Sequence, residues 1–192
     1  MEPDHRDEAG DALLRRSTED ATAFTPLVEQ HSAALHGYFA RRVPHAADDL
    51  LAETWLQAFA ARRGFDPVLG TARGWLFGVA RNVLLLHLRR AGRDTAVPTP
   101  ETSDPWQAVD QRLDAAALAP QLRRALADLP AEERELMLLV AWEQLTPSEA
   151  ASVVGIPAGT ARSRLHRARG RMRERLTPSW RAPRLTVSGE PA

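Results

Sequence analysis

The sequence predicts an all-α protein made of two small helical domains joined by a flexible linker. Apolar residues recur every three or four positions over most of its 192 residues, whereas the alternating pattern of strands and the Asn-Gly or Asp-Gly turns of hairpins are missing. Prolines among Gly, Thr, Ser and Asp at 91–105 oppose a packed core and favour an extended connection. A hydrophobic content of 44% is ordinary for a globular protein.

The same pattern gives the expected order of segments. Helices are predicted at about residues 23–41, 46–61, 71–90, 106–127, 131–144, 147–154 and 158–176. The expected domains are 22–92 and 119–177, joined by a linker at 93–118. The polar residues 1–21 and the tail 178–192 are expected to be disordered.

Composition argues against several classes of function. The chain has no cysteine, which removes disulfides, thiolate nucleophiles and cysteine-based metal sites. Its six histidines lack metal-ligand spacing, and it has neither a nucleophile elbow nor a phosphate-binding glycine loop, so we expect no catalytic residue, no metal and no cofactor. The acidic amino terminus lacks an apolar segment, which predicts a cytoplasmic protein without secretion signal or membrane span.

Residues 146–175 have the pattern of a helix-turn-helix. Thr146 and Glu149 have the spacing of a capping box, Gly155 ends the first helix, and Pro157 begins the second. The apolar stripe of the second helix is formed by Ala161, Leu165, Ala168, Met172 and Leu176. A helix packed on one side and cationic elsewhere suits the major groove of DNA.

The cationic face of this second helix has two interpretations. An arginine-rich amphipathic helix can simply be solvated. However, residues 160–175 contain seven arginines and one acid, Glu174, and like charges so close repel one another unless an anion is near. We therefore favour DNA binding, with these candidate contacts: Pro157, Arg162, Ser163, Arg164, His166 and Arg167.

The segment 46–61 combines an apolar face with an acidic one. The apolar face is formed by Leu51, Trp55, Ala58 and Phe59. The acidic face is formed at intervals of four residues by Asp49, Glu53 and Gln57. Spacing alone favours simple solvent exposure of the acidic face, and the alternative is a docking surface for a basic partner.

Aromatic residues and cations are interleaved between residues 62 and 93, where seven bases accompany one acid. A core stripe at helical spacing could be formed by Trp75, Val79, Val83 and Leu86. The polar and cationic residues around Phe65, Trp75 and Phe77 are Arg73, Arg81, Asn82, His87, Arg89, Arg90 and Arg93. Such a surface suits single-stranded DNA, because bases stack on aromatic faces, guanidinium groups hold the backbone, and an amide can read an unstacked base.

These segments resemble the sigma-70 superfamily of RNA polymerase sigma factors, in its extracytoplasmic-function (ECF) group, over about residues 24–176. DDLLAETWLQAF resembles region 2.2, GWLFGVARNVLLLHLRR resembles regions 2.3 and 2.4, and the stretch from ALADLP to RMRERL resembles region 4. The resemblance implies a subunit that directs promoter recognition, DNA melting and transcription initiation without enzymatic activity of its own. Its implied partners are core polymerase, double- and single-stranded promoter DNA and an anti-sigma protein.

The resemblance also implies roles for individual residues. Contacts with the beta-prime clamp helices of the polymerase are implied for Asp49, Glu53 and Gln57. Opening and reading of the minus-10 element is implied for Trp75, Arg81, Asn82 and Arg90, to which we add Phe65. Contacts with the minus-35 element are implied for Arg162, Ser163, His166 and Arg167, to which we add Pro157 and Arg164. The sequence departs from many relatives at Leu86, where an acid is common, and at Ala52, where glutamine is common.

A stand-alone helix-turn-helix repressor or activator is the alternative function. Such a protein would bind a palindrome as a dimer, which explains residues 146–175 but gives no role to the acidic face or to the aromatic and cationic segment. A sigma factor uses all three. Its linker has to join two promoter elements that lie about 70 Å apart, a distance of two turns of duplex DNA.

Overall fold

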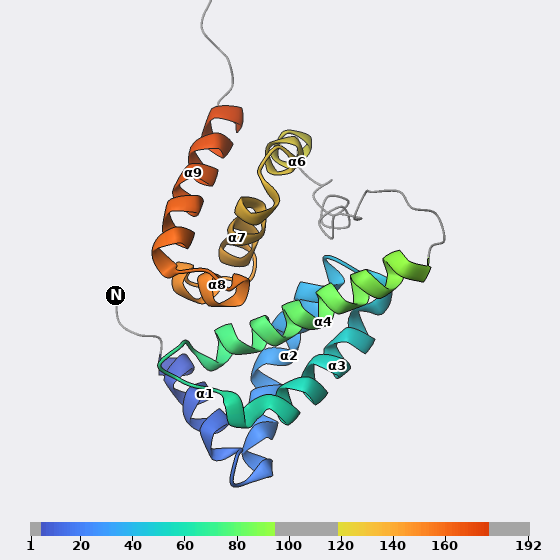
Figure 1. Cartoon of the computed structure of the whole chain (residues 1–192), viewed down its shortest axis with the longest axis vertical. Helices are drawn as coiled ribbons and strands as arrows, with labels where there is room; N and C mark the ends of the chain where they lie inside the picture. The colour runs from blue at the N-terminus through green and yellow to red at the C-terminus, as the bar shows by residue number, and fades with distance from the viewer. Residues whose placement is uncertain (1–4, 95–118, 177–192) are drawn as a thin grey trace, which may run out of the picture.

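The computed structural model describes residues 5–94 and 119–176 (Figure 1). Its α-helices are α1 (His5–Arg16), α2 (Thr25–Ala40), α3 (Ala47–Ala61), α4 (Ala72–Asp94), α6 (Ala119–Ala127), α7 (Ala131–Ala141), α8 (Pro147–Val154) and α9 (Ala158–Leu176). Short 3-10 turns are η1 (Ala21–Phe24), η2 (Pro44–Ala46) and η3 (Arg62–Gly64). No strand occurs within these two ranges, and the all-α prediction is confirmed. Of the expected linker at 93–118, residues 93 and 94 belong to α4, and the rest lies outside the described residues, as do the first part of the helix expected at 106–127 and the expected tail at 178–192.

Helix α4 lies between two groups of helices. Figure 1 shows α1, α2 and α3 on one side of it and α6 to α9 on the other, with α8 nearest to α4. The longest helices are α4, with 23 residues, and α9, with 19 residues. Helix α8 contacts both α4 and α9, so the two helices that we expect to meet single-stranded and duplex DNA belong to one packed body.

The prediction that residues 1–21 are disordered is wrong for the described part of this segment. Helix α1 occupies His5–Arg16, and the side chain of Leu14 is completely buried. Asp11 Oδ1 accepts a hydrogen bond of 2.5 Å from the backbone N–H of Ala72, so α1 satisfies one of the unpaired donors at the start of α4. The segment is polar overall, but a short stripe is buried on one face, formed by Gly10, Leu14 and Ser17.

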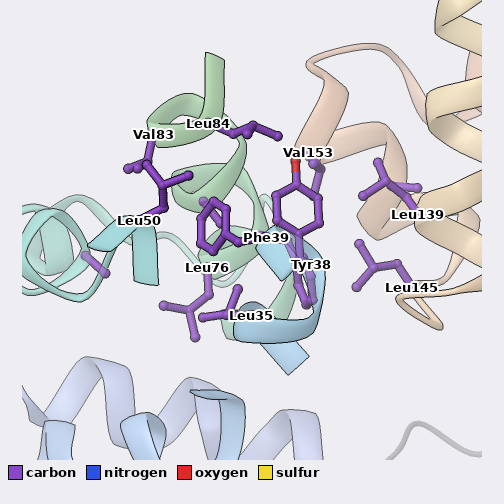
Figure 2. Close-up of a cluster of buried hydrophobic side chains, with 14 of the residues drawn as sticks. Leu35, Tyr38, Phe39, Leu50, Leu76, Val83, Leu84, Leu139, Leu145 and Val153 are labelled. Atoms are coloured by element: carbon purple, nitrogen blue, oxygen red, sulfur yellow. The ribbon is translucent and has the colours of Figure 1, made fainter. Parts of the chain in front are cut away.

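The main apolar core crosses from one helical group to the other. Tyr38 of α2 packs edge-to-face against Phe39 and Phe77, with ring centroids 5.3 and 5.7 Å apart. In Figure 2 the same ring lies next to Val153 of α8 and faces Leu139 of α7. A second, smaller cluster joins α6, α7 and α9, and its members are Ala125, Leu126, Leu129, Leu138, Ala168 and Met172.

The predicted core faces were confirmed for α9 and partly wrong for α3 and α4. In α9 the buried residues are the predicted Ala161, Leu165, Ala168 and Met172. In α3 they are Ala47, Leu50, Thr54 and Ala58, whereas Phe59 is 37% exposed. In α4 they include Leu76, Phe77, Ala80, Val83 and Leu84, whereas Trp75 and Val79 are only half-buried. Because α4 is covered on two sides, its buried face is wider than a single stripe.

His31 is buried among the amino-terminal helices and is 5% exposed. Its Nε2 lies 3.9 Å from the position that a Cβ on Gly10 would occupy, which places the ring under α1. Burial, together with the positive charge of Arg73, lowers the pKa of His31 to about 4. The imidazole is therefore neutral in the fold, whereas the unfolded chain takes up a proton near pH 6.5.

The stability contributed by neutral His31 should be lost as the pH falls from 6.5 towards 4, because only the unfolded chain then gains the proton. His31→Gln should remove about 2 kcal/mol of the drop in unfolding free energy between pH 7 and pH 5. Urea denaturation at both pH values measures the effect. His36→Gln, at a half-exposed position, is the control, and an unchanged pH dependence in His31→Gln would contradict the assignment.

Candidate nucleic-acid and polymerase interfaces

The helix-turn-helix has the predicted bounds and the predicted caps. Thr146 Oγ1 accepts from the backbone N–H of Glu149 at 3.2 Å, and Glu149 Oε2 accepts from the backbone N–H of Thr146 at 2.8 Å. Gly155 ends α8 in the left-handed region with φ 79°, a conformation that glycine adopts without steric cost. Pro157 follows and α9 begins at Ala158. The turn is therefore fixed by local hydrogen bonds and backbone geometry.

The first turns of α9 present their polar side chains to solvent. The exposed residues include Pro157, Arg162, Ser163, His166 and Arg167. Ser163 Oγ donates to the carbonyl of Thr160 at 2.9 Å, which orients its hydroxyl along the helix. Arg164 is less exposed, because its Nη1 lies 2.5 Å from Glu132 Oε2 on α7. Five of the six predicted minus-35 residues are thus exposed at the start of α9, whereas Arg164 is paired with α7.

Acidic residues outside α9 balance part of its positive charge, which the sequence argument did not foresee. The ion pairs join Arg164 to Glu132, Arg167 and Arg171 to Glu133, and Arg175 to Asp128. Glu133 is nearly buried, and its distances to Arg171 and Arg167 are 2.6 and 3.4 Å. The repulsion that we took as a sign of bound DNA is thus partly relieved within the fold. The contacts to Glu133 also restrict the orientation of Arg167.

A pocket of about 280 Å³ lies beside the amino-terminal half of α4. Phe65 and Trp75 line it with ring centroids 5.9 Å apart and planes at 65°. Asn82 also lines it and is exposed, so its amide can be reached from solvent. Arg90 lies two turns further along α4 and is exposed. Aromatic faces and an amide therefore line one opening, and Arg90 lies outside it, further along the same helix.

Arg81, in contrast, is already paired with an acidic side chain. Its Nε and Nη2 donate to both carboxylate oxygens of Glu135 on α7, at 2.6 and 3.0 Å. This hydrogen-bonded pair raises the pKa of Arg81 above its usual value, and only 21% of the side chain is exposed. The structure does not place Arg81 with the pocket-lining residues, and its partner is 54 positions away in the sequence.

The acidic face of α3 is exposed, and apolar side chains accompany it. Asp49 and Glu53 are exposed, and Gln57 Nε2 donates to Glu53 Oε1 at 2.7 Å. Leu56 is 69% exposed and Phe59 37% exposed on the same helix. Sequence reasoning missed both, because it placed Phe59 in the core and did not consider Leu56. The signal for Leu56 was its position three residues after Glu53, on the acidic side.

The described part of the chain contains neither a cluster of metal-ligating side chains nor a membrane-spanning helix. Within residues 5–94 and 119–176, no group of three or more His, Asp or Glu side chains could hold a metal ion. None of the helices in these ranges is long and apolar enough to cross a bilayer.

Comparison with known proteins identifies the family. Residues 27–94 match the family described as Sigma-70 region 2, and residues 120–172 match Sigma-70, region 4. The chain is 31% identical to the ECF RNA polymerase sigma factor SigL of Mycobacterium tuberculosis, over 77% of this chain and 85% of SigL. This chain belongs to the ECF group of the sigma-70 family. Membership assigns it to transcription initiation, and the predicted sigma-factor function is confirmed in preference to a stand-alone regulator.

Other ECF factors are similar to this chain over most of its length. SigE of Mycolicibacterium smegmatis is 34% identical over 78% of this chain, which spans 60% of the length of SigE. RpoE of Cereibacter sphaeroides is 31% identical over 86% of this chain and 94% of its own length. Among solved structures, CnrH in complex with the cytosolic domain of CnrY has a TM-score of 0.58 at 25% identity, over 86% of this chain and 96% of CnrH. RpoE of Bartonella quintana, in complex with the anti-sigma factor NepR, shares the fold with a TM-score of 0.56 at 24% identity, over 81% of this chain and 98% of that chain.

Proposed function

We propose that this ECF factor is a non-enzymatic, cytoplasmic specificity subunit in which α3 binds core polymerase, the pocket on α4 captures unpaired minus-10 bases, and α9 reads the minus-35 element. The observation that carries the proposal is the presence, in one chain, of an exposed acidic helix, an aromatic pocket with an exposed amide, and a capped helix-turn-helix. A repressor needs only the last of these. The three surfaces also correspond to three separate tasks in initiation.

For the minus-35 element, α9 supplies base and phosphate contacts from different turns. Its first turns carry Arg162, Ser163 and His166 on an exposed surface, where they can reach base edges in a major groove. Later arginines lie where they can meet phosphates. Arg167 is held on one side by Glu133 at 3.4 Å, a distance long enough for its guanidinium to exchange that contact for a base.

For the minus-10 element, the pocket on α4 suits one unstacked base. Its volume of about 280 Å³ is close to the lower end of small-ligand pockets, which is about 300 Å³. Trp75 and Phe65 offer aromatic faces for stacking, and Asn82 offers both a donor and an acceptor. Capture of a flipped base offsets part of the unstacking cost, which is a few kcal/mol per base step.

For polymerase, α3 offers a mixed surface. Asp49 and Glu53 provide negative charge for a basic partner, and Leu56 and Phe59 provide apolar area beside it. Charged residues direct encounter and apolar area gives affinity, so the two together suit a specific docking surface. We also propose an anti-sigma protein as a further partner, because CnrH and the Bartonella quintana RpoE are both found in complexes, the latter with an anti-sigma factor.

Reconstitution with sigma-free core polymerase tests the function as a whole. The full chain should cosediment with core polymerase and direct run-off transcription from a subset of a genomic promoter pool. A protein that binds duplex DNA but neither cosediments with polymerase nor starts transcripts would instead be a stand-alone regulator.

Arg167→Ala should weaken binding to cognate minus-35 duplex by about 1–3 kcal/mol, because a guanidinium can bond two atoms of one base. Fluorescence anisotropy with cognate and scrambled duplexes measures the loss. Arg169→Ala is the comparison for a phosphate contact, since Arg169 is one of the later, exposed arginines of α9, and it should lose affinity equally on both duplexes. Equal losses on both duplexes would assign Arg167 to phosphate instead.

Glu53→Arg should weaken binding to core polymerase roughly tenfold, because it places a cation against a basic partner surface. Binding of minus-35 duplex by the same variant should be unchanged, since α3 and α9 lie on different sides of α4. Glu29→Arg, an equally large charge change at an exposed position of α2, is the control. Normal assembly of the Glu53 variant would remove α3 from the docking surface.

Trp75→Ala should weaken binding of single-stranded minus-10 DNA by about 1–3 kcal/mol, the worth of one stacked base. Trp75→Phe should restore most of the affinity, because it keeps an aromatic face. Permanganate footprinting of the holoenzyme should show less melting for the alanine variant and unchanged closed-complex formation. A wild-type footprint would show that bases do not stack on Trp75.

A further inference from the structure

Two glycines belong to the wall that α4 contributes to the pocket. The residues of this wall lie at helical spacing on one face, and they are Gly74, Trp75, Gly78, Val79 and Asn82. The other lining residues belong to the segment 64–70, apart from Ser152 of α8. A glycine inside a helix is destabilising relative to alanine, because it loses more conformational freedom on folding. A role in packing or in binding would account for each of the two glycines.

Packing explains Gly74. A Cβ at this position would lie 3.3 Å from the side chain of Glu149 and 3.4 Å from Thr71 Oγ1, so a side chain would force its neighbours to move. Gly74 is also buried, and no larger residue could occupy its place without displacing α8. The small size of Gly74 is therefore required by the contact between α4 and α8.

Packing does not explain Gly78. Apart from its chain neighbours and the backbone of its own helix turns, no atom of the described residues lies within 4 Å of the position that a Cβ on Gly78 would take. Gly78 also has an ordinary helical backbone, without the positive φ that favours glycine. An alanine would therefore fit the fold at this position. The open space above Gly78 is the pocket itself, which Gly78 lines.

The arrangement of the aromatic rings directs a base across Gly78. The ring centroids of Phe65 and Trp75 are 5.9 Å apart with planes at 65°, so the two rings touch edge to face and leave no room for a base between them. A base therefore has to stack on the free face of one ring. Gly78 lies one turn after Trp75 and one turn before Asn82. A base that stacks on Trp75 and bonds to the Asn82 amide therefore crosses the backbone at residue 78.

The same spacing favours the larger class of base. Along the helix axis, Trp75 and Asn82 are separated by about 10 Å. The fused rings of a purine cover more of this distance than the single ring of a pyrimidine. The pocket has little volume to spare, because its 280 Å³ or so lies below the range of about 300–1,000 Å³ of small-ligand pockets. A methyl group above the backbone at residue 78 would therefore obstruct a purine more than a pyrimidine.

We propose that Gly78 sets the size of this pocket, and that its missing side chain allows the pocket to take an unpaired purine of the minus-10 element. The proposal rests on the proposed function and adds the class of base that the pocket selects. In this arrangement Trp75 stacks on the base, Asn82 bonds to its edge, and the backbone at Gly78 forms the floor between them. Glycine at this position lowers the stability of α4 and in return keeps the pocket open.

Gly78→Ala tests the proposal, because it should change stability and binding in opposite directions. The urea midpoint of the full chain should rise, since alanine is the better helix former and its Cβ would meet no other side chain of the described residues. The probes are single-stranded non-template oligonucleotides from a promoter that the run-off experiment identifies, with a purine or a pyrimidine at each minus-10 position. Wild-type holoenzyme should prefer a purine at one position, and Gly78→Ala should weaken binding of that purine strand roughly tenfold and of the pyrimidine strand much less.

Gly92→Ala is the matched control. Gly92 belongs to the same helix, is exposed and also has open space around a Cβ among the described residues, but it does not line the pocket. This variant should bind both strands as the wild type does. A Gly78→Ala variant that binds like the wild type, loses both strands equally or is less stable would overturn the size-setting role, as would wild-type holoenzyme that initiates transcription without preferring a purine. Wild-type protein that neither assembles with core polymerase nor starts transcripts would instead overturn the proposed function, and the inference with it.

Discussion

The arrangement of this molecule depends on α4, which packs against the amino-terminal helices and against α8. Helices α1 to α3 cover one side and α8 covers another, so the remaining surface is narrow and carries the pocket, Asn82 and Arg90. The start of the same helix is fixed by Asp11 from α1 and by Thr71, which is itself bonded to Glu149 of α8. Any movement of the carboxy-terminal group therefore changes the environment of the residues that we assign to minus-10 DNA.

The ion pairs between the arginines of α9 and neighbouring acidic residues have two effects. The buried Glu133 and the exposed Asp128 and Glu132 relieve repulsion among the arginines of α9, which allows a strongly cationic helix to fold without DNA. The same pairs hold guanidinium groups in defined positions before DNA arrives. An exposed pair contributes little stability, so its exchange for a phosphate or a base costs little. A cationic helix with weak internal partners is well suited to reversible binding.

Local signals allowed the helix-turn-helix to be predicted residue by residue. The cap at Thr146, the glycine at 155 and the proline at 157 act within a few positions, so α8 and α9 have the predicted bounds. Helix α1 was not predicted, because its short buried stripe lies among seven acidic residues in the first twenty residues of the sequence. The pairing of Arg81 with Glu135 could not be predicted, because it joins residues 54 positions apart and depends on how two helical groups pack. Sequence patterns thus predicted the surfaces, and only tertiary structure shows which of them are covered.

Buried charges join the two helical groups, because the carboxylate of Glu143, which follows α7, accepts hydrogen bonds from Arg41 and Arg42. Replacing a buried ion pair with apolar residues often stabilises a protein, so charged groups such as Glu143 contribute specificity of register more than binding energy. Arg42 also has partners within its own helical group. Arg42 Nη1 donates to the carbonyl of Tyr38 at 2.8 Å, and its guanidinium lies 3.7 Å from the centre of the Tyr38 ring, two contacts that do not involve the carboxy-terminal group. Arg81 can exchange Glu135 for a phosphate of the same charge type. Of these two cations, Arg81 therefore has its charged partner in the carboxy-terminal group, whereas Arg42 also has contacts within its own group.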